Sequence, residues 1–377
     1  EWFGAAINLL NDAEPTFDPN AFTEQGKLLD GWESRRKRTP GHDWCIIQLG
    51  LPGRVRGIEV DTAFFTGNHA PRFSLQAASL DPSLPELQRL AHHWSRERVG
   101  TAAGDDELTL VAALRPDEWR ELVPVTPLQP GYADSSRQFF PVTDETAGNG
   151  GNGGNGAGSS SGGGRVTHVR LNMFPDGGIA RLRVYGEVER DWASVAAREV
   201  LDLAAVENGG IAVGCSDKHF GEPKNMIKAG RGVNMGDGWE TARHAHRPPV
   251  LRLGTDGLLQ YPAGQGSDNA VLKLGTAGVV QRLVVDTMHF KGNFPESAAV
   301  DGCYTPGALP EAFQDKEGGK GMPWRPLLRR TRMGPDREHT FELGRGELED
   351  CGAITHLRLT ISPDGGVMRL RAFGVKA

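Results

Sequence analysis

The chain has 377 residues and a formal net charge of −6 at pH 7. A mildly acidic chain gives no electrostatic support for a nucleic-acid or anionic-membrane partner, and no apolar run approaches the roughly 18 residues of a transmembrane helix. The four cysteines, Cys45, Cys215, Cys303 and Cys351, form no C-x-x-C pair, which argues against a zinc or iron–sulfur site. Sparse, unclustered cysteines indicate reduced thiols and an intracellular protein.

Short apolar segments dominate the first part of the chain. The run WCIIQLG (44–50) predicts a strand that ends at a glycine, and VRGIEVDTAFF (55–65) is more continuously apolar, as a central strand would be. Further along, SLPELQRLAHHW (83–94) predicts a helix in a region that otherwise has the composition of a loop.

Two strands of alternating character follow. In THVRLNMF (167–174), polar residues such as His168 alternate with apolar ones, and ARLRVYG (180–186) alternates in the same way. Period two predicts half-buried strands, and the PDGG between them predicts a β-hairpin turn. The next segment, DWASVAAREVLDLAAV (191–206), predicts a connecting helix.

The second half of the chain repeats the first in the same order. DGWESRR (30–36) returns as DGWETAR (237–243), and GRVRGIEVDTAFFTGN (53–68) returns as GVVQRLVVDTMHFKGN (278–293). Likewise, RVTHVRLNMFPDGGIARLRVYG (165–186) returns as AITHLRLTISPDGGVMRLRAFG (353–374). Two copies of one domain therefore fill nearly the whole chain: copy one at residues 1–189 and copy two at 203–377. Short strands, Gly/Pro turns and 51 glycines predict an all-β sandwich in each copy.

Copy one differs from copy two by an insertion and by its start. The glycine-rich tract at 147–164 has the composition of an interdomain linker, but RVTHVRL after it still belongs to copy one. We therefore interpret it as an inserted surface loop, disordered because it has almost no side chains to bury. EWFGAAINLL (1–10) matches KHFGEPKNMI (218–227), so residues 203–217 have no counterpart, and we expect copy one to be truncated at its N-terminus and to lack an edge strand.

The DGWE motif combines a turn, a large aromatic side chain and charged groups. In copy two, Asp237 and Trp239 lead into Glu240 and Arg243. One interpretation is a turn beside a core tryptophan, with the acid and base forming a surface ion pair. The other is a site in which an acid and a base beside an aromatic wall bind a polar, planar ligand. The same pattern occurs in copy one with Asp30, Trp32, Glu33 and Arg35.

The DTxxFxGN motif places a carboxylate and an amide at the end of a strand, where sandwiches carry ligand contacts. These residues are Asp286 and Asn293 in copy two, with an Asx-type turn as the structural alternative. Copy two also has His219, His289 and Lys291 where copy one has Trp2, Phe64 and Thr66. Because imidazole titrates near neutrality, we expect proton transfer to reside in copy two.

Arginines and histidines provide two further candidate sites. Arg369 and Arg371, like Arg181 and Arg183 in copy one, are expected to project outward with His356 and His168 on the same face. They could clamp a carboxylate or form a solvated surface. His244-x-His246 could supply half of a metal site, but no third ligand is evident. G-x-S-x-G, P-loop, H-E-x-x-H and Rossmann motifs are absent from the sequence.

These segments together resemble the allantoicase (allantoate amidinohydrolase) family. The likeness is carried by DGWESRRKR, GHDWCIIQLG and IEVDTAFFTGNHAP, then by DKHFGEP, DGWETARH and VVDTMHFKGNFPESAAVDGC, and it covers nearly the whole chain. It implies two tandem jelly-roll sandwiches of the galactose-binding-like type and an enzyme of purine degradation that hydrolyses allantoate to ureidoglycolate and urea. It also implies a cytoplasmic or peroxisomal location. The glycine-rich insertion is not expected of this family.

The chemistry of that reaction assigns roles by residue type. The scissile carbon carries a carboxylate and two ureido groups, so catalysis needs a cation clamp, ureido contacts and groups that move protons. Asn293 and Glu240 suit the ureido contacts, and His289, Asp286 or His219 suit proton transfer. The expected substrate-binding residues are Asp237, Trp239, Glu240, Arg243, Lys291, Asn293, Arg369 and Arg371. No cofactor is implied, while a divalent metal and a homo-oligomer stay open.

A rival interpretation is a non-catalytic tandem sandwich that binds a small ligand or a carbohydrate, because fold does not fix function. Such a module usually has exposed loop aromatics and disulfides, whereas the cysteines here are few and are not paired by their spacing.

Deletion of residues 148–162 should leave the melting temperature and the activity nearly unchanged, because a tract without side chains cannot offset its ordering entropy. Thermal melts and activity assays of the deletion variant beside the full chain test this. A loss of several degrees would show that the tract packs on the domain.

Overall fold

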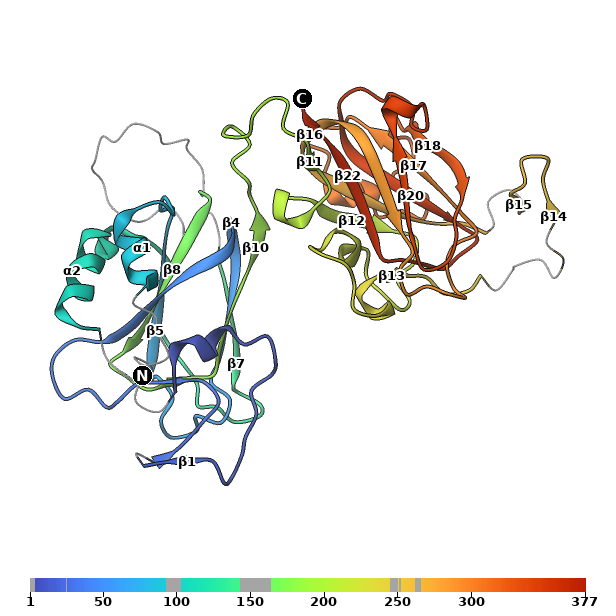
Figure 1. Ribbon diagram of the computed structural model, residues 1–377. Coiled ribbons are helices and arrows are strands. Elements are labelled where there is room, and N and C mark those ends of the chain that lie inside the picture. The colour runs from blue at the N-terminus through green and yellow to red at the C-terminus, as the bar shows by residue number, and fades with distance from the viewer. Residues whose placement is uncertain are drawn as a thin grey trace. The chain divides into compact units, whose positions relative to one another are not determined.

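The computed structural model describes residues 4–24, 26–92, 103–142, 164–244, 250, 252–261 and 266–377. The chain divides into two compact units, Glu1–Glu187 and Val188–Ala377, which contain copy one and copy two (Figure 1). Each unit has its own apolar core. Nearly all of the glycine-rich tract, to residue 163, lies outside the described residues.

Copy one is a β-sandwich with two short α-helices. The helices are α1 (Pro85–His92) and α2 (Asp105–Ala113), with the 3₁₀ helices η1 (Ala6–Leu10) and η3 (Pro116–Glu118). The strands are β1 (Phe22–Thr23), β2 (Gly26–Lys27), β3 (Trp32–Glu33), β4 (Asp43–Asp61), β5 (Arg72–Ala78), β6 (Arg120–Pro127), β7 (Arg137–Pro141), β8 (Val166–Phe174), β9 (Gly178–Ile179) and β10 (Arg181–Val188).

Copy two repeats this arrangement with 3₁₀ helices between its strands. The strands are β11 (Leu201–Asp202), β12 (Ile211–Cys215), β13 (Trp239–Glu240), β14 (Arg252–Leu253), β15 (Leu259–Gln260), β16 (Asp268–Asp286), β17 (Ser297–Cys303), β18 (Arg325–Arg332), β19 (Glu338–Glu342), β20 (Ile354–Ser362), β21 (Gly366–Val367) and β22 (Arg369–Lys376). The helices are η4 (Val206–Asn208), η5 (Pro223–Ile227), η6 (Met235–Asp237), η7 (Pro310–Phe313) and η8 (Leu343–Arg345).

One long strand in each copy belongs to both layers of the sandwich. In copy two, the first part of β16 (268–273) pairs with β20 and β12, and its last part (278–286) pairs with β22 and β19. The register shifts between Lys273 and Gly278, where the strand turns the corner. Strand β4 does the same in copy one, pairing with β8 at its start and β7 at its end. The predicted pair of tandem jelly-roll sandwiches is confirmed.

A buried phenylalanine joins the repeated motifs at one end of each sandwich. Phe290 is fully buried, and its ring atoms lie 2.0 Å from where a Cβ on Gly366 would stand and 2.9 Å from one on Gly238. Phe65 occupies the same place in copy one, against Gly178 and Gly31. The DGWE and PDGG glycines recur because no side chain fits between them and the ring.

The predicted hairpin across PDGG does not form. Strand β20 pairs with the first part of β16 and β22 with its last part, so the two strands lie in opposite layers. The PDGG segment instead crosses the end of the sandwich into β21, which pairs with β13 of the DGWE motif. Period two identifies a strand but does not identify its partner, and the prediction was therefore wrong.

Strand β8 is buried on both faces, where the sequence predicted a half-buried strand. His168 is 2% exposed, and Asn172 donates from Nδ2 to the Ser74 hydroxyl at 3.1 Å. The segment around η3 covers this face, since Arg170 Nη1 lies 3.5 Å from an Asp117 carboxylate oxygen. Polar alternation in β8 therefore marks internal hydrogen bonding rather than solvent.

The two helix predictions had opposite outcomes. Helix α1 lies within the predicted range 83–94, and residues 93–94 lie outside the described part. The helix predicted at 191–206 is absent from this fully described segment, which forms turns and β11. Leu201 and Asp202 pair with β22, and the Asp202 carboxylate accepts the Ala372 amide at 2.9 Å. Tertiary pairing overrides helical propensity here. In the described residues, no helix has the length and apolar character needed to cross a membrane.

Trp239→Ala should lower the free energy of unfolding by about 3–5 kcal/mol, the range for a large-to-small core substitution. Trp239 is fully buried and donates from Nε1 to the Asp217 carbonyl at 2.9 Å; Trp32 in copy one is 3% exposed. Chemical denaturation of Trp239→Ala and Trp32→Ala tests both positions. A variant of unchanged stability with weakened substrate affinity would support the ligand-wall interpretation instead.

The stability of copy two should fall on acidification because of His356. This ring is 1% exposed and stacks on Phe313; burial and then the Lys273 charge lower its pKa from 6.5 to about 4. Between about pH 6.5 and about pH 4, His356 binds a proton in the unfolded chain but stays neutral in the folded one. The free energy of unfolding therefore falls as pH falls through this window, by roughly 3 kcal/mol in total. His356→Gln should flatten the stability profile over that window, and an unchanged slope would contradict this.

Candidate active site

A cavity of about 610 Å³ opens in copy two where the three repeated motifs meet. Glu240 and Arg243 come from the DGWE segment, Asn293 from the turn after β16, and Asp364 from PDGG. Phe220, Glu296 and Arg332 add an aromatic and two charged groups to the wall. The fold thus gathers acid, amide and guanidinium groups that are far apart in the sequence.

Backbone pairing holds the central acid of this cavity. Glu240 pairs with Gly366 between β13 and β21, and its carbonyl accepts the Phe220 amide at 3.1 Å. Its side chain accepts a hydrogen bond at Oε1 from Nδ2 of Asn293. The DGWE and GN motifs recur together because the acid of one is held by the amide of the other.

Copy one has the same acid–amide pair. Asn68 Nδ2 donates to Glu33 Oε1 at 2.6 Å. Burial raises the pKa of Glu33, against the lowering effect of the hydrogen bond from Asn68. The pair is therefore an original feature of the repeated domain, and differences between the copies must come from the residues around it.

The cavity brings together some of the residues singled out from the sequence. Glu240, Arg243 and Asn293 line it. His219 is exposed and is not part of the lining, but its ring meets the cavity residue Phe220 edge-on at 4.3 Å. The other expected site residues are not part of the lining: Asp237, Trp239, Asp286, His289, Lys291, Arg369 and Arg371.

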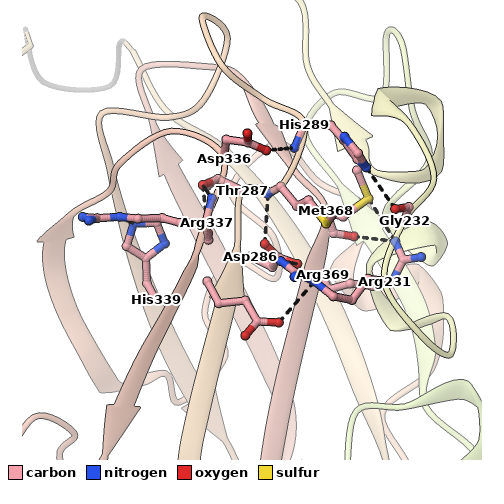
Figure 2. A network of polar contacts seen from close by, with 12 residues as sticks. Arg231, Gly232, Asp286, Thr287, His289, Asp336, Arg337, His339, Met368 and Arg369 are labelled. Carbon is pink, nitrogen blue, oxygen red and sulfur yellow. Dashed lines mark hydrogen bonds and ion pairs between the residues drawn. The ribbon is translucent and has the colours of Figure 1, made fainter.

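Asp286 and His289 belong to a neighbouring polar network (Figure 2). Asp286 is 1% exposed, and its Oδ1 accepts the Met288 amide at 2.9 Å. Its Oδ2 lies 3.6 Å from Arg231 and accepts no hydrogen bond from any described residue. His289 has a positive φ of 70° and its Nε2 lies 3.0 Å from the Gly232 carbonyl. Phe64 has the same φ in copy one, so this backbone strain belongs to the turn rather than to the imidazole.

The remaining expected residues have structural contacts. The Asp237 carboxylate accepts the Val233 amide at 2.7 Å, and Lys291 is exposed, 3.8 Å from Asp336. Arg369 is 4% exposed and donates to the Gly230 and Asp237 carbonyls. The predicted outward arginine clamp with His356 is therefore wrong. The Arg369 guanidinium turns inward because loop carbonyls need donors, and His356 lies on β20 in the core. Arg371 is half-buried and donates to the Gly230 carbonyl at 2.8 Å.

An ion pair beside this network has its acid and its base in opposite positions in the two copies. In copy two, Arg231 Nε lies 3.5 Å from Glu338, which stands opposite Asp286 on β19. In copy one, Arg137 stands opposite Asp61 on β7, 3.8 Å from Glu14. Glu14 and Arg231 occupy equivalent positions. Glu14 follows the residue whose carbonyl accepts from Nε of Arg181, and Arg231 follows the residue whose carbonyl accepts from Nε of Arg369.

Copy one also closes the position that corresponds to His289. Phe64 stands there, and Phe17 stacks on it at 5.3 Å between ring centroids. Phe17 precedes the β1–β2 hairpin, and Lys27 of that hairpin lies 4.4 Å above the Phe17 ring. Trp2, the counterpart of His219, lies outside the described residues.

Several residues of the cavity lining are not singled out by the sequence analysis, among them Arg332 and Asp364. The PDGG motif indicates only a turn residue at Asp364, whereas in the structure its carboxylate accepts the His244 amide at 2.9 Å. Arg332 ends β18 at the place where copy one has Pro127, as the strand registers show. A comparison of the two copies along this strand would have identified it.

His244 has a partner other than a metal. Its Nε2 lies 3.1 Å from Asp268, just as Lys37 lies 2.8 Å from Asp43 in copy one. His246 lies outside the described residues, and within the ranges that are described no group of three or more His, Cys, Asp or Glu residues is arranged to hold a metal.

Comparisons with known proteins agree on one family. The family model for the allantoicase repeat matches residues 1–189 and 201–377. The chain is 39% identical over 374 residues to a probable allantoicase of Pseudomonas aeruginosa, covering 99% of this chain and 90% of that protein. It is 36% identical to probable allantoicase 1 of Burkholderia mallei, covering 99% and 89%.

A solved structure agrees with these sequence relatives. The crystal structure of allantoicase from Saccharomyces cerevisiae matches with a TM-score of 0.59 and 32% identity, over 99% of this chain and 87% of that one. Two family repeats, relatives of this identity over nearly the whole length and a shared fold lead to one conclusion: the chain belongs to the allantoicase family.

Proposed function

We propose that this chain hydrolyses allantoate to ureidoglycolate and urea, as a step in purine degradation. The observation that carries the proposal is the cavity in copy two, where the Glu240–Asn293 pair stands beside Arg243. The names of the relatives support the same substrate. An intracellular location, in the cytoplasm or a peroxisome, fits the four unpaired cysteine thiols.

The reaction replaces one C–N bond by a C–O bond. Water adds its hydroxyl to the carbon that bears the carboxylate, and its proton goes to the nitrogen of the departing urea, so no redox partner is needed. The substrate offers one anion and two neutral ureido groups. A carboxylate and an amide oxygen can accept the ureido N–H groups, and the amide nitrogen can donate to a ureido carbonyl. Glu240 and Asn293 provide these groups at the cavity wall.

Proton transfer is best assigned to a side chain that reaches the substrate. Glu240 meets this condition because it lines the cavity, and Asn293 fixes one of its oxygens. His219, whose ring contacts Phe220 of the lining, can assist. His289 and Asp286, assigned from the sequence, would act from the adjacent network, where the Gly232 carbonyl and Arg231 lie against them.

The direct test is urea release from allantoate by the purified chain. Release with a stoichiometric amount of ureidoglycolate supports the proposal. Binding of allantoate without urea release would favour the rival, non-catalytic binding module.

Glu240→Gln should lower turnover by about 10²-fold or more, the usual contribution of a general acid or base, while the melting temperature changes little. Glu33→Gln is the matched control in copy one and should be much milder. Steady-state kinetics of both, beside His289→Ala, Asp286→Asn and Asp61→Asn, separate the assignments. A 10²-fold loss in His289→Ala or Asp286→Asn with a near-normal Glu240→Gln would place proton transfer in the network instead.

A further inference from the structure

The charges of the cavity in copy two are unevenly matched. Each acid of the lining has a donor: Glu240 accepts from Asn293, Glu296 from Arg330 and the Leu259 amide, and Asp364 from the His244 amide. The two guanidiniums of the lining, Arg243 and Arg332, are exposed, and neither has an ion pair or a side-chain hydrogen bond with any part of the described chain. Unpaired cations at a cavity wall favour an anionic ligand.

The fold sets Arg332 firmly at this wall. It is the last residue of β18, opposite Ser297 on β17, and the next residue, Met333, donates its amide to the Glu296 carbonyl at 2.9 Å. The backbone is therefore fixed on both sides of Arg332 while its guanidinium stays available. A planar guanidinium can hold a carboxylate through two parallel hydrogen bonds.

We propose that Arg332, together with Arg243, forms the subsite that binds the carboxylate of the substrate and so selects anionic ureides over neutral ones. This inference rests on the proposed function and adds the group that recognises the anion. With the carboxylate at the arginines, a ureido group falls to the Glu240–Asn293 pair on the same wall.

Copy one lacks half of this subsite. It retains the Glu33–Asn68 pair, and Arg36 corresponds to Arg243. The position of Arg332 is different: Arg332 stands opposite Ser297 in copy two, whereas Pro127 stands opposite Arg72 in copy one. A proline side chain cannot bind a carboxylate. Copy one therefore has no guanidinium at the position of Arg332, and its exposed Arg72 lies on the facing strand instead, so the subsite defined by Arg243 and Arg332 belongs to copy two.

The test compares allantoate with its neutral primary carboxamide, in the full chain and in Arg332→Gln. We expect Arg332→Gln to raise KM for allantoate by about 10- to 100-fold, the value of a charge-assisted hydrogen-bonded pair, with kcat changed by less than about threefold. Inhibition of allantoate hydrolysis by the carboxamide should be nearly the same in both proteins. Added chloride should raise KM in the parent chain more steeply than in the variant.

Arg329→Gln is the matched control, because Arg329 lies on the same strand, pairs with Glu349 and is not part of the cavity lining. It should behave as the parent chain does, and Arg332→Lys should be intermediate. If the parent chain releases urea and Arg332→Gln has the same KM for allantoate as the parent, the proposed subsite is wrong while the proposed function stands. Equal weakening of allantoate and carboxamide also overturns the subsite. A parent chain that releases no urea overturns the proposed function instead.

Discussion

The contact between one phenylalanine ring and two glycines organises the end of each sandwich. Phe290 follows β16, the strand that joins both layers, and its ring leaves no room for a Cβ on Gly238 or Gly366. This contact holds the DGWE, GN and PDGG segments against one another. Glu240, Asn293 and Asp364 project from those three segments into the cavity, so the geometry of the site depends on the same packing that closes the core.

Much of this arrangement could be predicted from the sequence, because duplication marks which residues the domain needs. The all-β class, the two copies, the region of α1, and Glu240, Arg243 and Asn293 at one site all follow from repeated motifs or alternation. The partners of the strands do not follow, since alternation describes one strand at a time. That is why the strands flanking PDGG were paired with each other rather than with the two ends of β16.

Buried polar groups account for the other differences. His356 and Arg369 occupy polar positions of alternating strands, and the pattern alone predicts solvent on that side. In the fold, hydroxyls near His356 and loop carbonyls near Arg369 take the place of water. Arg332 was missed for the opposite reason, because nothing repeated points to it: its counterpart is Pro127. Repeated motifs identify residues that the two domains share, but they do not identify a residue that is present in one domain only.

The exchanged ion pair has a consequence for the history of the chain. Glu14 meets Arg137 in copy one, whereas Arg231 meets Glu338 in copy two. If recombination copied the loop of one half into the other, two glutamates or two arginines would face each other beside a buried aspartate, and like charges repel. Solvent screens these side chains, each about half exposed or more, so the mismatch would cost little stability. It would nonetheless leave the loop and the facing strand of the hybrid unmatched, so these two elements of each half form a set that changed together.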